Sequence, residues 1–478
     1  MNAPSGQDRL LSRLLTISCV LTVLLSLLLV SYYGDLAPRS VLIGTQDGAA
    51  AQQLGDPGDQ APGSVQSAGA VDQPVSAATS GAPKTSTSQA PRKVTAADSS
   101  RGVSKGSIKI GGIFTETGPY DGRPADYSAR AYIQMINAEG GVNGRKIEYI
   151  SYDDGYDPTQ GLNAARRLVE QDKVFAIVGW LAPNTEPAAS EYFAKTGIPV
   201  IGGLGVPQEF GPSNFFSVSS NFAKAGAGLA RFPCEGGVKK PAVGVVNLSY
   251  SDQMVAGFKR GIEQCKGLEP VTYEKIDATE TNYSGKILSW RAMGADSILA
   301  GLDPMSYVRL FQALAQQEWY PPVYIAGFAD TERNAYVAKA LEKIHVINME
   351  SELLPSIHMD LPGARRYVET LHKYYPGTTI AALAEMSWSG AQVFVEGLRR
   401  AGPEPTRENF IAALETFREF KMDLLPPMTY LRGNQDSVRC VEVQQWKDGG
   451  WKDFYPDWQC WDYTPNGGAA KAASKPFG

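Results

Sequence analysis

Apolar residues are spaced along residues 107–326 in two alternating ways, one typical of strands and the other of helices. Short runs that are apolar on both faces predict buried strands. Between these runs, apolar residues recur three and four positions apart, which predicts helices with one buried face. The predicted strands are residues 108–114, 147–152, 174–178, 198–201, 242–246, 297–300 and 323–326. The predicted helices between them cover residues 129–136, 158–169, 187–196, 253–264 and 308–316.

The remaining part of the chain is predicted to contain more helix. Three further helical patterns cover residues 364–374, 380–401 and 407–417. They are followed by two strand-like runs, residues 438–446 and 451–454, and Asp448-Gly449-Gly450 between them predicts the turn of a hairpin.

The alternation of strands and helices indicates an α/β fold in which helices cover parallel sheets. The pattern begins again near residue 242, and residues 107–463 are too many for one compact core. We therefore expect two doubly wound lobes.

The N-terminal apolar run covers residues 14–33 and contains no charged side chain. A helix of about 20 residues spans a hydrocarbon core of about 30 Å. Two arginines precede the run, which favours a cytoplasmic N-terminus, and two tyrosines at its end suit a membrane interface. We expect residues 1–34 to be a cytoplasmic start and single transmembrane anchor, with a cleaved signal peptide and secretion as the alternative.

Residues 35–106 are rich in Ala, Gly, Ser, Pro, Gln and Thr and contain no Phe, Trp or Tyr. Such a segment buries too little apolar surface to offset the entropy lost on ordering. We expect a disordered linker that holds the folded part away from the membrane, and residues 466–478 to be a tail.

Composition narrows the function classes. The chain has 45 Lys and Arg against 50 Asp and Glu, a net charge of -5, so it has no electrostatic footprint for a nucleic-acid partner. One of the five cysteines lies in the apolar run, and the other four suggest two disulfides. Three connectivities are open; we predict Cys234–Cys265 and Cys440–Cys460, with four free thiols as the alternative. There is no CxxC pair and there are three histidines, so no metal site or cofactor is expected.

Ligands of open parallel sheets bind beyond the carboxyl ends of the strands. The loops at those ends are residues 115–121, 180–185, 202–207, 247–252, 301–305 and 327–330. They hold few titratable side chains and several glycines, prolines and aromatic residues. This composition suits a binding cleft better than a catalytic centre, and no nucleophile–base motif is present, so we expect a protein that is not an enzyme.

Several spaced motifs resemble the leucine/isoleucine/valine-binding branch of the type I periplasmic binding proteins. They are Ile108-Lys109-Ile110-Gly111, Thr117-Gly118-Pro119, Ile136-Asn137, residues 140–145 (GGVNGR), Tyr152-Asp153-Asp154, Asp157-Pro158, Gly179, Thr185, Pro187-Ala188 and residues 197–201 (GIPVI). The resemblance runs from about residue 107 to about residue 431.

The resemblance implies two Rossmann-like lobes joined by a three-stranded hinge, with crossings near Ser219–Ser220, Val346 and Leu425. Lobe 1 would comprise residues 107–220 and 346–424, and lobe 2 residues 221–345 and 425–465. It also implies that a small-molecule solute binds between the lobes and closes the hinge, and that an ABC permease in the membrane recognises the closed form.

The same resemblance points to residues that contact the solute. Relatives that bind amino acids hold the α-carboxylate with hydroxyl side chains in loops corresponding to residues 179–185 and 202–207, but the second loop has no hydroxyl here. The candidates in these loops are Trp180, Ala182 and Asn184, and the backbone N–H groups of Leu204 and Gly205.

Relatives hold the ligand's ammonium group with an acid that follows the strand at residues 323–326. Asp330 follows this strand and Asp303 follows the preceding one; the alternative for both is a solvated turn residue. Tyr250 matches a position that packs on the ligand, and Tyr120 is a similar candidate.

The sequence therefore predicts an extracytoplasmic receptor for an amino acid or similar small polar solute, acting with an ABC-type importer. A membrane-tethered ligand sensor with the same fold is the alternative.

Overall fold

The structure of the 478-residue chain is a computed structural model. It describes residues 99–118, 121–182, 184–205, 212–219, 221–248, 250–327, 331–381, 383–432, 438, 440–460 and 471–473. The expected anchor, residues 14–33, lies outside the described residues, as does most of the expected linker. Within the part of the chain that is described, no helix is both long and apolar enough to cross a membrane.

The end of the expected linker is ordered against the fold. Residues 99–106 are described, and the Lys109 amide donates to the Gly102 carbonyl at 2.9 Å. Gly102 has a φ of +86° and a Cβ there would lie 2.5 Å from the Phe175 backbone nitrogen, so a larger residue would not fit. The folded part therefore begins before residue 107.

The first sheet is parallel throughout, with the strand order β2-β1-β3-β4-β5. Its strands are β1 (Ser107–Phe114), β2 (Lys146–Asp153), β3 (Ala176–Val178), β4 (Val200–Ile201) and β5 (Phe215–Phe216). Successive residues of a strand point to opposite faces. Val178 accordingly packs in one hydrophobic core and Ile177 in another.

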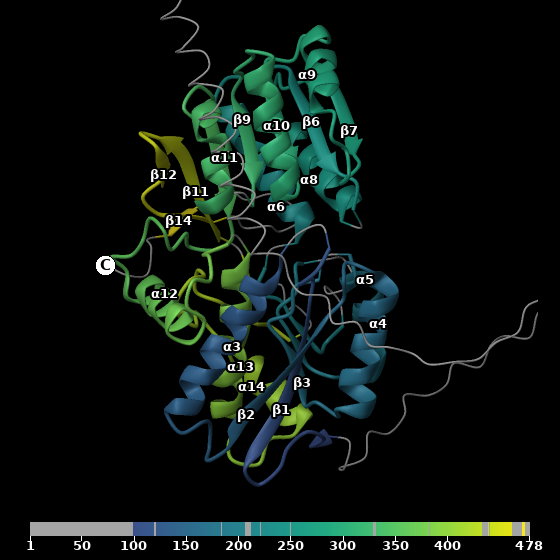
Figure 1. Ribbon diagram of the computed structural model, residues 1–478, viewed down its shortest axis with the longest axis vertical. Coiled ribbons are helices and arrows are strands. Elements are labelled where there is room, and N and C mark those ends of the chain that lie inside the picture. Colours follow the sequence, from purple (N-terminus) through teal and green to yellow (C-terminus); the bar gives the residue numbers. More distant parts are fainter. Residues whose placement is uncertain are drawn as a thin grey trace, which may run out of the picture. The chain divides into compact units, whose positions relative to one another are not determined.

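Helices cover both faces of this sheet (Figure 1). One face carries α3 (Arg123–Ala138), α12 (Pro362–Tyr374), α13 (Ala384–Ala401) and α14 (Arg407–Leu414). The other carries α4 (Pro158–Arg166), the π-helix η1 (Arg167–Gln171) and α5 (Glu186–Thr196). Helix α13 begins at Ala384 rather than at the expected residue 380, because Leu383 has a left-handed φ of +72°, which an α-helix excludes.

The second sheet has the order β14-β13-β11-β10-β9-β8-β6-β7, and β12 pairs with β11. The strands β6 (Pro241–Val246), β7 (Thr272–Ile276), β8 (Ser297–Gly301), β9 (Val323–Ala326) and β10 (Val346–Glu350) are parallel. An antiparallel group completes the sheet: β11 (Cys440–Lys447), β12 (Gly450–Asp453), β13 (Trp458–Cys460) and β14 (Lys471–Ala473). The predicted hairpin is thus present as β11 and β12.

Helices also cover both faces of the second sheet. One face packs against α6 (Phe222–Leu229), α7 (Arg231–Glu235) and α8 (Ser251–Glu263). The other packs against α9 (Tyr283–Ala292), α10 (Pro304–Gln316) and α11 (Thr331–Leu341). The elements β7, α6, α7, α9 and α11 were not among those predicted from the sequence. The expected α/β fold with parallel, helix-covered sheets is confirmed.

The chain passes between the two sheets after β10 and returns before β11. The Leu353 amide donates to the Leu424 carbonyl at 2.7 Å, so the outgoing and returning segments lie side by side. Strand β10 pairs within the second sheet, whereas Leu425 and Tyr430 belong to the core of the first. The exact boundaries of the two lobes stay a prediction.

Both predicted disulfides are present. Cys234–Cys265 joins α7 to the segment that follows α8, and Cys440–Cys460 joins β11 to β13. Bridges of this kind suit an oxidising, extracytoplasmic compartment.

Candidate solute-binding site

A cavity of about 180 Å³ is lined by residues from the ends of strands in both sheets. Leu181 and Leu204 follow β3 and β4 of the first sheet, and Tyr250, Asp303 and Gly327 follow β6, β8 and β9 of the second. The cavity therefore lies where ligands of open parallel sheets bind, beyond the carboxyl ends of the strands.

The walls of this cavity are largely apolar. The larger apolar side chains along it are Leu181, Leu204, Phe222, Leu248, Tyr250, Met254, Leu302, Met305, Met349, Leu383 and Met386. The rings of Phe222 and Tyr250 are stacked, with centroids 3.9 Å apart and planes 9° from parallel. They offer a flat aromatic surface to a bound molecule, so the cavity suits a solute with an apolar body.

Three sequence-predicted residues line the cavity: Leu204, Tyr250 and Asp303. The Asp303 carboxylate caps α10, since it accepts hydrogen bonds from the Met305 and Ser306 amides at 3.0 and 3.1 Å. Capping the helix is sufficient reason for an aspartate at this position. A contact between Asp303 and a solute stays a prediction.

Four other predicted residues are not among those that line the cavity. Trp180 is buried against Phe193, with ring centroids 5.4 Å apart, and Ala182 is buried in the same core. The Asn184 side chain donates to the Tyr156 carbonyl at 3.0 Å, so it supports a cavity residue from behind. Gly205 does not line the cavity either.

One of the two amides expected to receive an anion, that of Leu204, is engaged within the protein. Glu186, at the start of α5, accepts from the Ala182 amide at 3.0 Å and from the Leu204 amide at 2.8 Å. Its side chain is fully buried. An internal carboxylate thus occupies the Leu204 amide, which is one of the two backbone donors predicted for the solute; the role of the other, Gly205, stays a prediction. Tyr120 and Asp330 lie outside the described residues, so their proposed contacts stay predictions.

The sequence pattern of the periplasmic binding proteins matches residues 107–451, which is most of the chain. This chain belongs to the periplasmic binding protein family. It is of type I and falls in the leucine/isoleucine/valine-binding branch, as its motifs predicted.

Three comparisons illustrate the relationship. An amino acid binding protein of Pseudomonas aeruginosa is 29% identical over 39% of this chain, a match that covers 53% of that relative. The Leu/Ile/Val-binding protein homolog 7 of Brucella abortus is 24% identical over 73% of this chain and 92% of its own length. The solved structure of a fatty acid ABC transporter substrate-binding protein from Thermomonospora curvata has a TM-score of 0.66 at 20% identity, covering 79% of this chain and 94% of that one.

Buried glutamates stand at one end of the cavity in this periplasmic binding protein. Glu350 and Glu352 line it, and Glu385 lies close by at the start of α13. Burial, followed by repulsion from Glu350 and Glu385, raises the pKa of the Glu352 carboxyl well above its usual range. These residues were not among the predicted site residues, although a buried acid at the end of strand β10 and another two positions later form an unusual pattern that could have drawn attention to them.

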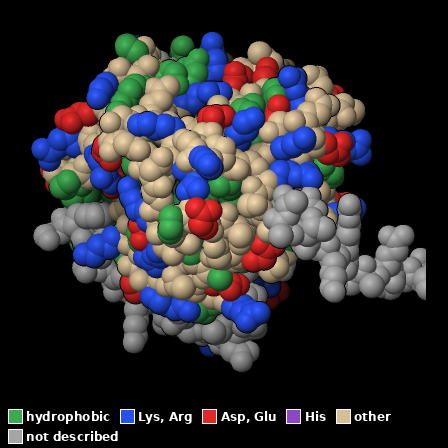
Figure 2. All heavy atoms as spheres, turned by 90° about the horizontal axis from the view of Figure 1, so that it is seen from below, with side chains coloured by type: hydrophobic (Ala, Val, Ile, Leu, Met, Phe, Trp, Pro, Cys, Tyr) green, Lys and Arg blue, Asp and Glu red, His purple; other side chains and the backbone are tan. Residues whose placement is uncertain are grey.

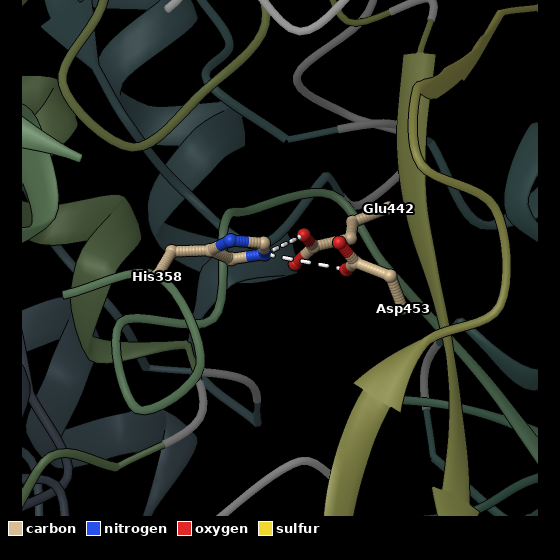
Figure 3. Close-up of side chains that lie close together, drawn as sticks. All are labelled: His358, Glu442 and Asp453. Atoms are coloured by element: carbon tan, nitrogen blue, oxygen red, sulfur yellow. Dashed lines mark hydrogen bonds and ion pairs between the residues drawn. The ribbon is translucent and has the colours of Figure 1, made fainter. Parts of the chain in front are cut away.

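A second polar cluster consists of His358, Glu442 of β11 and Asp453 of β12, whose side chains lie in contact (Figure 3). The imidazole Nε2 contacts a Glu442 carboxylate oxygen and lies 3.4 Å from Asp453 Oδ1. The other Glu442 oxygen accepts from the Leu354 amide at 2.9 Å and from the Gln444 side chain at 2.8 Å. These contacts complete a buried polar cluster that was not predicted from the sequence.

The surface of this binding protein carries charges of both signs. On the face shown in Figure 2, Lys and Arg side chains are interspersed with Asp and Glu.

Proposed function

We propose that this chain is the extracytoplasmic solute receptor of an ABC-type importer. The observation that carries the proposal is one cavity lined by strand ends of both sheets. A solute bound there contacts both sheets at once, so its binding energy favours the arrangement that brings them together. An ABC permease then recognises that arrangement and receives the solute chemically unchanged.

The proposed solute is an amino acid or similar small molecule with a polar group. Because the walls of the cavity are apolar, the solute should also have an apolar part, as leucine and its analogues do. Tyr250, stacked on Phe222, is the proposed wall for that body. Leu204 and Asp303 are proposed to contact the solute from the two opposing sets of loops.

The chain is further proposed to be tethered to the membrane by residues 14–33, with residues 35–106 as a spacer. The support is the uncharged apolar run and the aromatic-free segment that follows it. Intact-mass measurement of the protein from its native membrane tests this point. Retention of residues 1–34 is expected, and a mature protein that lacks them would contradict the tether.

Thermal unfolding of the full chain tests solute binding. A screen of amino acids, small carboxylates, amides and amines is expected to contain compounds that raise the midpoint, because a ligand that binds the folded state alone stabilises it. A screen in which no compound shifts the midpoint would contradict the receptor proposal.

A ligand sensor with the same fold is the second candidate. Neighbouring genes distinguish the two, since genes for a permease and an ATPase beside this one favour import. A gene for a signalling partner in their place favours sensing.

A further inference from the structure

The cavity is poorly equipped for a solute carboxylate. The Ala182 and Leu204 amides, which lie in the loops where relatives grip that group, already donate to Glu186. A solute carboxylate would have to displace this buried carboxylate from both of these hydrogen bonds. Buried charge without hydrogen bonds is strongly unfavourable.

Positive charge is also scarce along the cavity. Among the described residues that line it, Arg309 is the one Lys or Arg. Its guanidinium donates to the Ala278 carbonyl at 2.9 Å. Because this guanidinium already donates a hydrogen bond to the backbone, Arg309 is a weak candidate for binding an anionic solute.

The cavity lining also includes acidic side chains, and one of them has an oxygen without a hydrogen-bond donor. Three of the four lining acids are already engaged: Asp121 is paired with Arg123, Asp303 caps α10, and Glu350 accepts a hydrogen bond from Asn348 at 3.0 Å. Glu350 and Glu352 are both more than nine-tenths buried. Within the described part of the chain, Glu352 Oε1 is buried and has no hydrogen-bond partner. A buried oxygen without a donor at the edge of a binding cavity calls for a donor supplied by the ligand.

A metal ion is a less suitable occupant than an organic cation. In the described residues, the group of His, Cys, Asp and Glu ligand atoms close enough to share an ion is His358, Glu442 and Asp453, which does not include Glu352. The surrounding walls are apolar, which favours a ligand that brings its own apolar surface.

We propose that the solute is an organic monocation, an amine with an apolar body and no carboxylate, whose charged group binds Glu352. This inference rests on the proposed receptor function and names the class of solute. It differs from the expectation drawn from relatives, in which an acid after β9 holds the ammonium and loop hydroxyls hold a carboxylate.

The ionisation of Glu352 supplies a direct signature of this binding. Burial and the neighbouring glutamates favour the protonated carboxyl in the free protein. An ammonium group within hydrogen-bond distance favours the carboxylate, so binding of a charged amine releases a proton from Glu352 to solvent.

The experiment is calorimetric titration of the full chain with four compounds that share one isobutyl group: isoamylamine, isoamyl alcohol, isocaproate and leucine. They carry a cation, a neutral hydroxyl, an anion and a zwitterion respectively. Isoamylamine is expected to bind most tightly. Repeating its titration in buffers of different ionisation enthalpy is expected to show proton release in the wild-type protein.

Two variants localise the effect. Glu352→Gln keeps the shape of the side chain and removes its charge; it is expected to weaken isoamylamine binding about 10- to 100-fold and to abolish proton release, while affinity for isoamyl alcohol changes little. Glu191→Gln, an exposed glutamate of α5, is the matched control and is expected to leave both quantities unchanged.

Each other outcome overturns the inference. Tighter binding of leucine or isocaproate than of isoamylamine would reject the class of solute while supporting the receptor function. Isoamylamine binding that is unaffected by Glu352→Gln and releases no proton would reject the assignment to Glu352. If none of the four compounds binds, the inference fails, and the broader screen then decides whether the receptor function also fails.

Discussion

The acidic side chains in and near the cavity differ in the hydrogen bonds that their oxygen atoms accept. Asp303 accepts two backbone amides at the start of a helix, and Glu186 accepts two more from neighbouring loops. Glu352 is buried with one oxygen lacking a partner. The first two carboxylates therefore stabilise the fold, whereas the third lowers its stability when ionised. A residue that weakens the folded state at a binding cavity is often kept for its function.

The first stability prediction concerns Glu352→Gln. The pKa of Glu352 in the folded protein lies above the reference value of 4.5, so the folded state holds a proton that the unfolded state releases. Wild-type stability therefore falls as the pH rises from 4.5 through the raised pKa. Glutamine does not titrate, so we expect the variant to be more stable than wild type near neutral pH and this advantage to disappear below 4.5.

Urea unfolding at a series of pH values measures this difference. Glu191→Gln should unfold with the same pH profile as wild type. Equal stability of Glu352→Gln and wild type at every pH would show that Glu352 is not held as an unfavourable buried acid.

At the scale of elements, close contact between α6 and α8 depends on glycine. A Cβ added at Gly257 of α8 would lie 2.3 Å from the Ala223 carbonyl oxygen of α6, and one at Gly261 would lie 2.6 Å from the Ala227 carbonyl oxygen. These distances are shorter than any real contact of a Cβ atom, so the helices approach this closely because neither position has a side chain. Phe222 of α6 and Met254 of α8 line the cavity, so this helix pair also shapes the site.

Gly257→Ala is expected to destabilise the protein by about 1–3 kcal/mol, because the added methyl group meets backbone that cannot move without separating the helices. Helix propensity alone would favour the substitution by about 1 kcal/mol. Gly285→Ala in α9 is the matched control: its nearest neighbours are Asn282 side-chain atoms at 3.6 Å or more, so stabilisation of up to about 1 kcal/mol is expected there. Thermal or urea unfolding of the two variants decides the matter, and stabilisation by both would contradict the packing argument.

At the scale of the whole molecule, a buried polar network lies where the chain leaves the second sheet. His358 lies between β10 and α12, and α12 packs in the core of the first sheet. Its partner Glu442 belongs to β11, next to Gln444, which hydrogen-bonds to Asn348 of β10 at 2.9 Å. Asn348 in turn donates to Glu350 at the cavity, at 3.0 Å. The network therefore connects the crossing segment to the solute site.

His358→Ala is expected to lower the unfolding free energy by about 3–5 kcal/mol, because it leaves the fully buried Glu442 carboxylate without its imidazole partner. His345→Ala, at an exposed position before β10, is the control and should change stability by less than about 0.5 kcal/mol. Urea unfolding followed by tryptophan fluorescence provides the measurement. A loss at His358 no larger than that at His345 would mean that the contact between His358 and Glu442 does not stabilise the crossing.

Much of the fold could be predicted because its causes are local. The doubly apolar run that became β6 and the spaced apolar residues of α3 specify a buried strand and a one-sided helix whatever surrounds them. Some of the elements that were not predicted have weak local patterns. In β7, Tyr273 and Lys275 alternate with less exposed residues at a sheet edge, and α9 has almost no apolar stripe despite its buried Trp290. Edge strands and such helices are decided by their neighbours rather than by their own periodicity.

The sequence by itself determined the α/β class, the family and the position of the loops at the strand ends, because each is encoded in short patterns of residues. The tertiary structure decided the disulfide pairing among the three open connectivities, because it places Cys234 beside Cys265 and Cys440 beside Cys460. Only the tertiary structure decided which loop residues face the cavity. Trp180 turned into the core and Tyr250 toward the site, although both follow strands. It also brought Glu186 to the amides of Ala182 and Leu204, and left one oxygen of Glu352 without a partner. Hydrogen bonds between distant residues depend on geometry in three dimensions, and no local pattern records them.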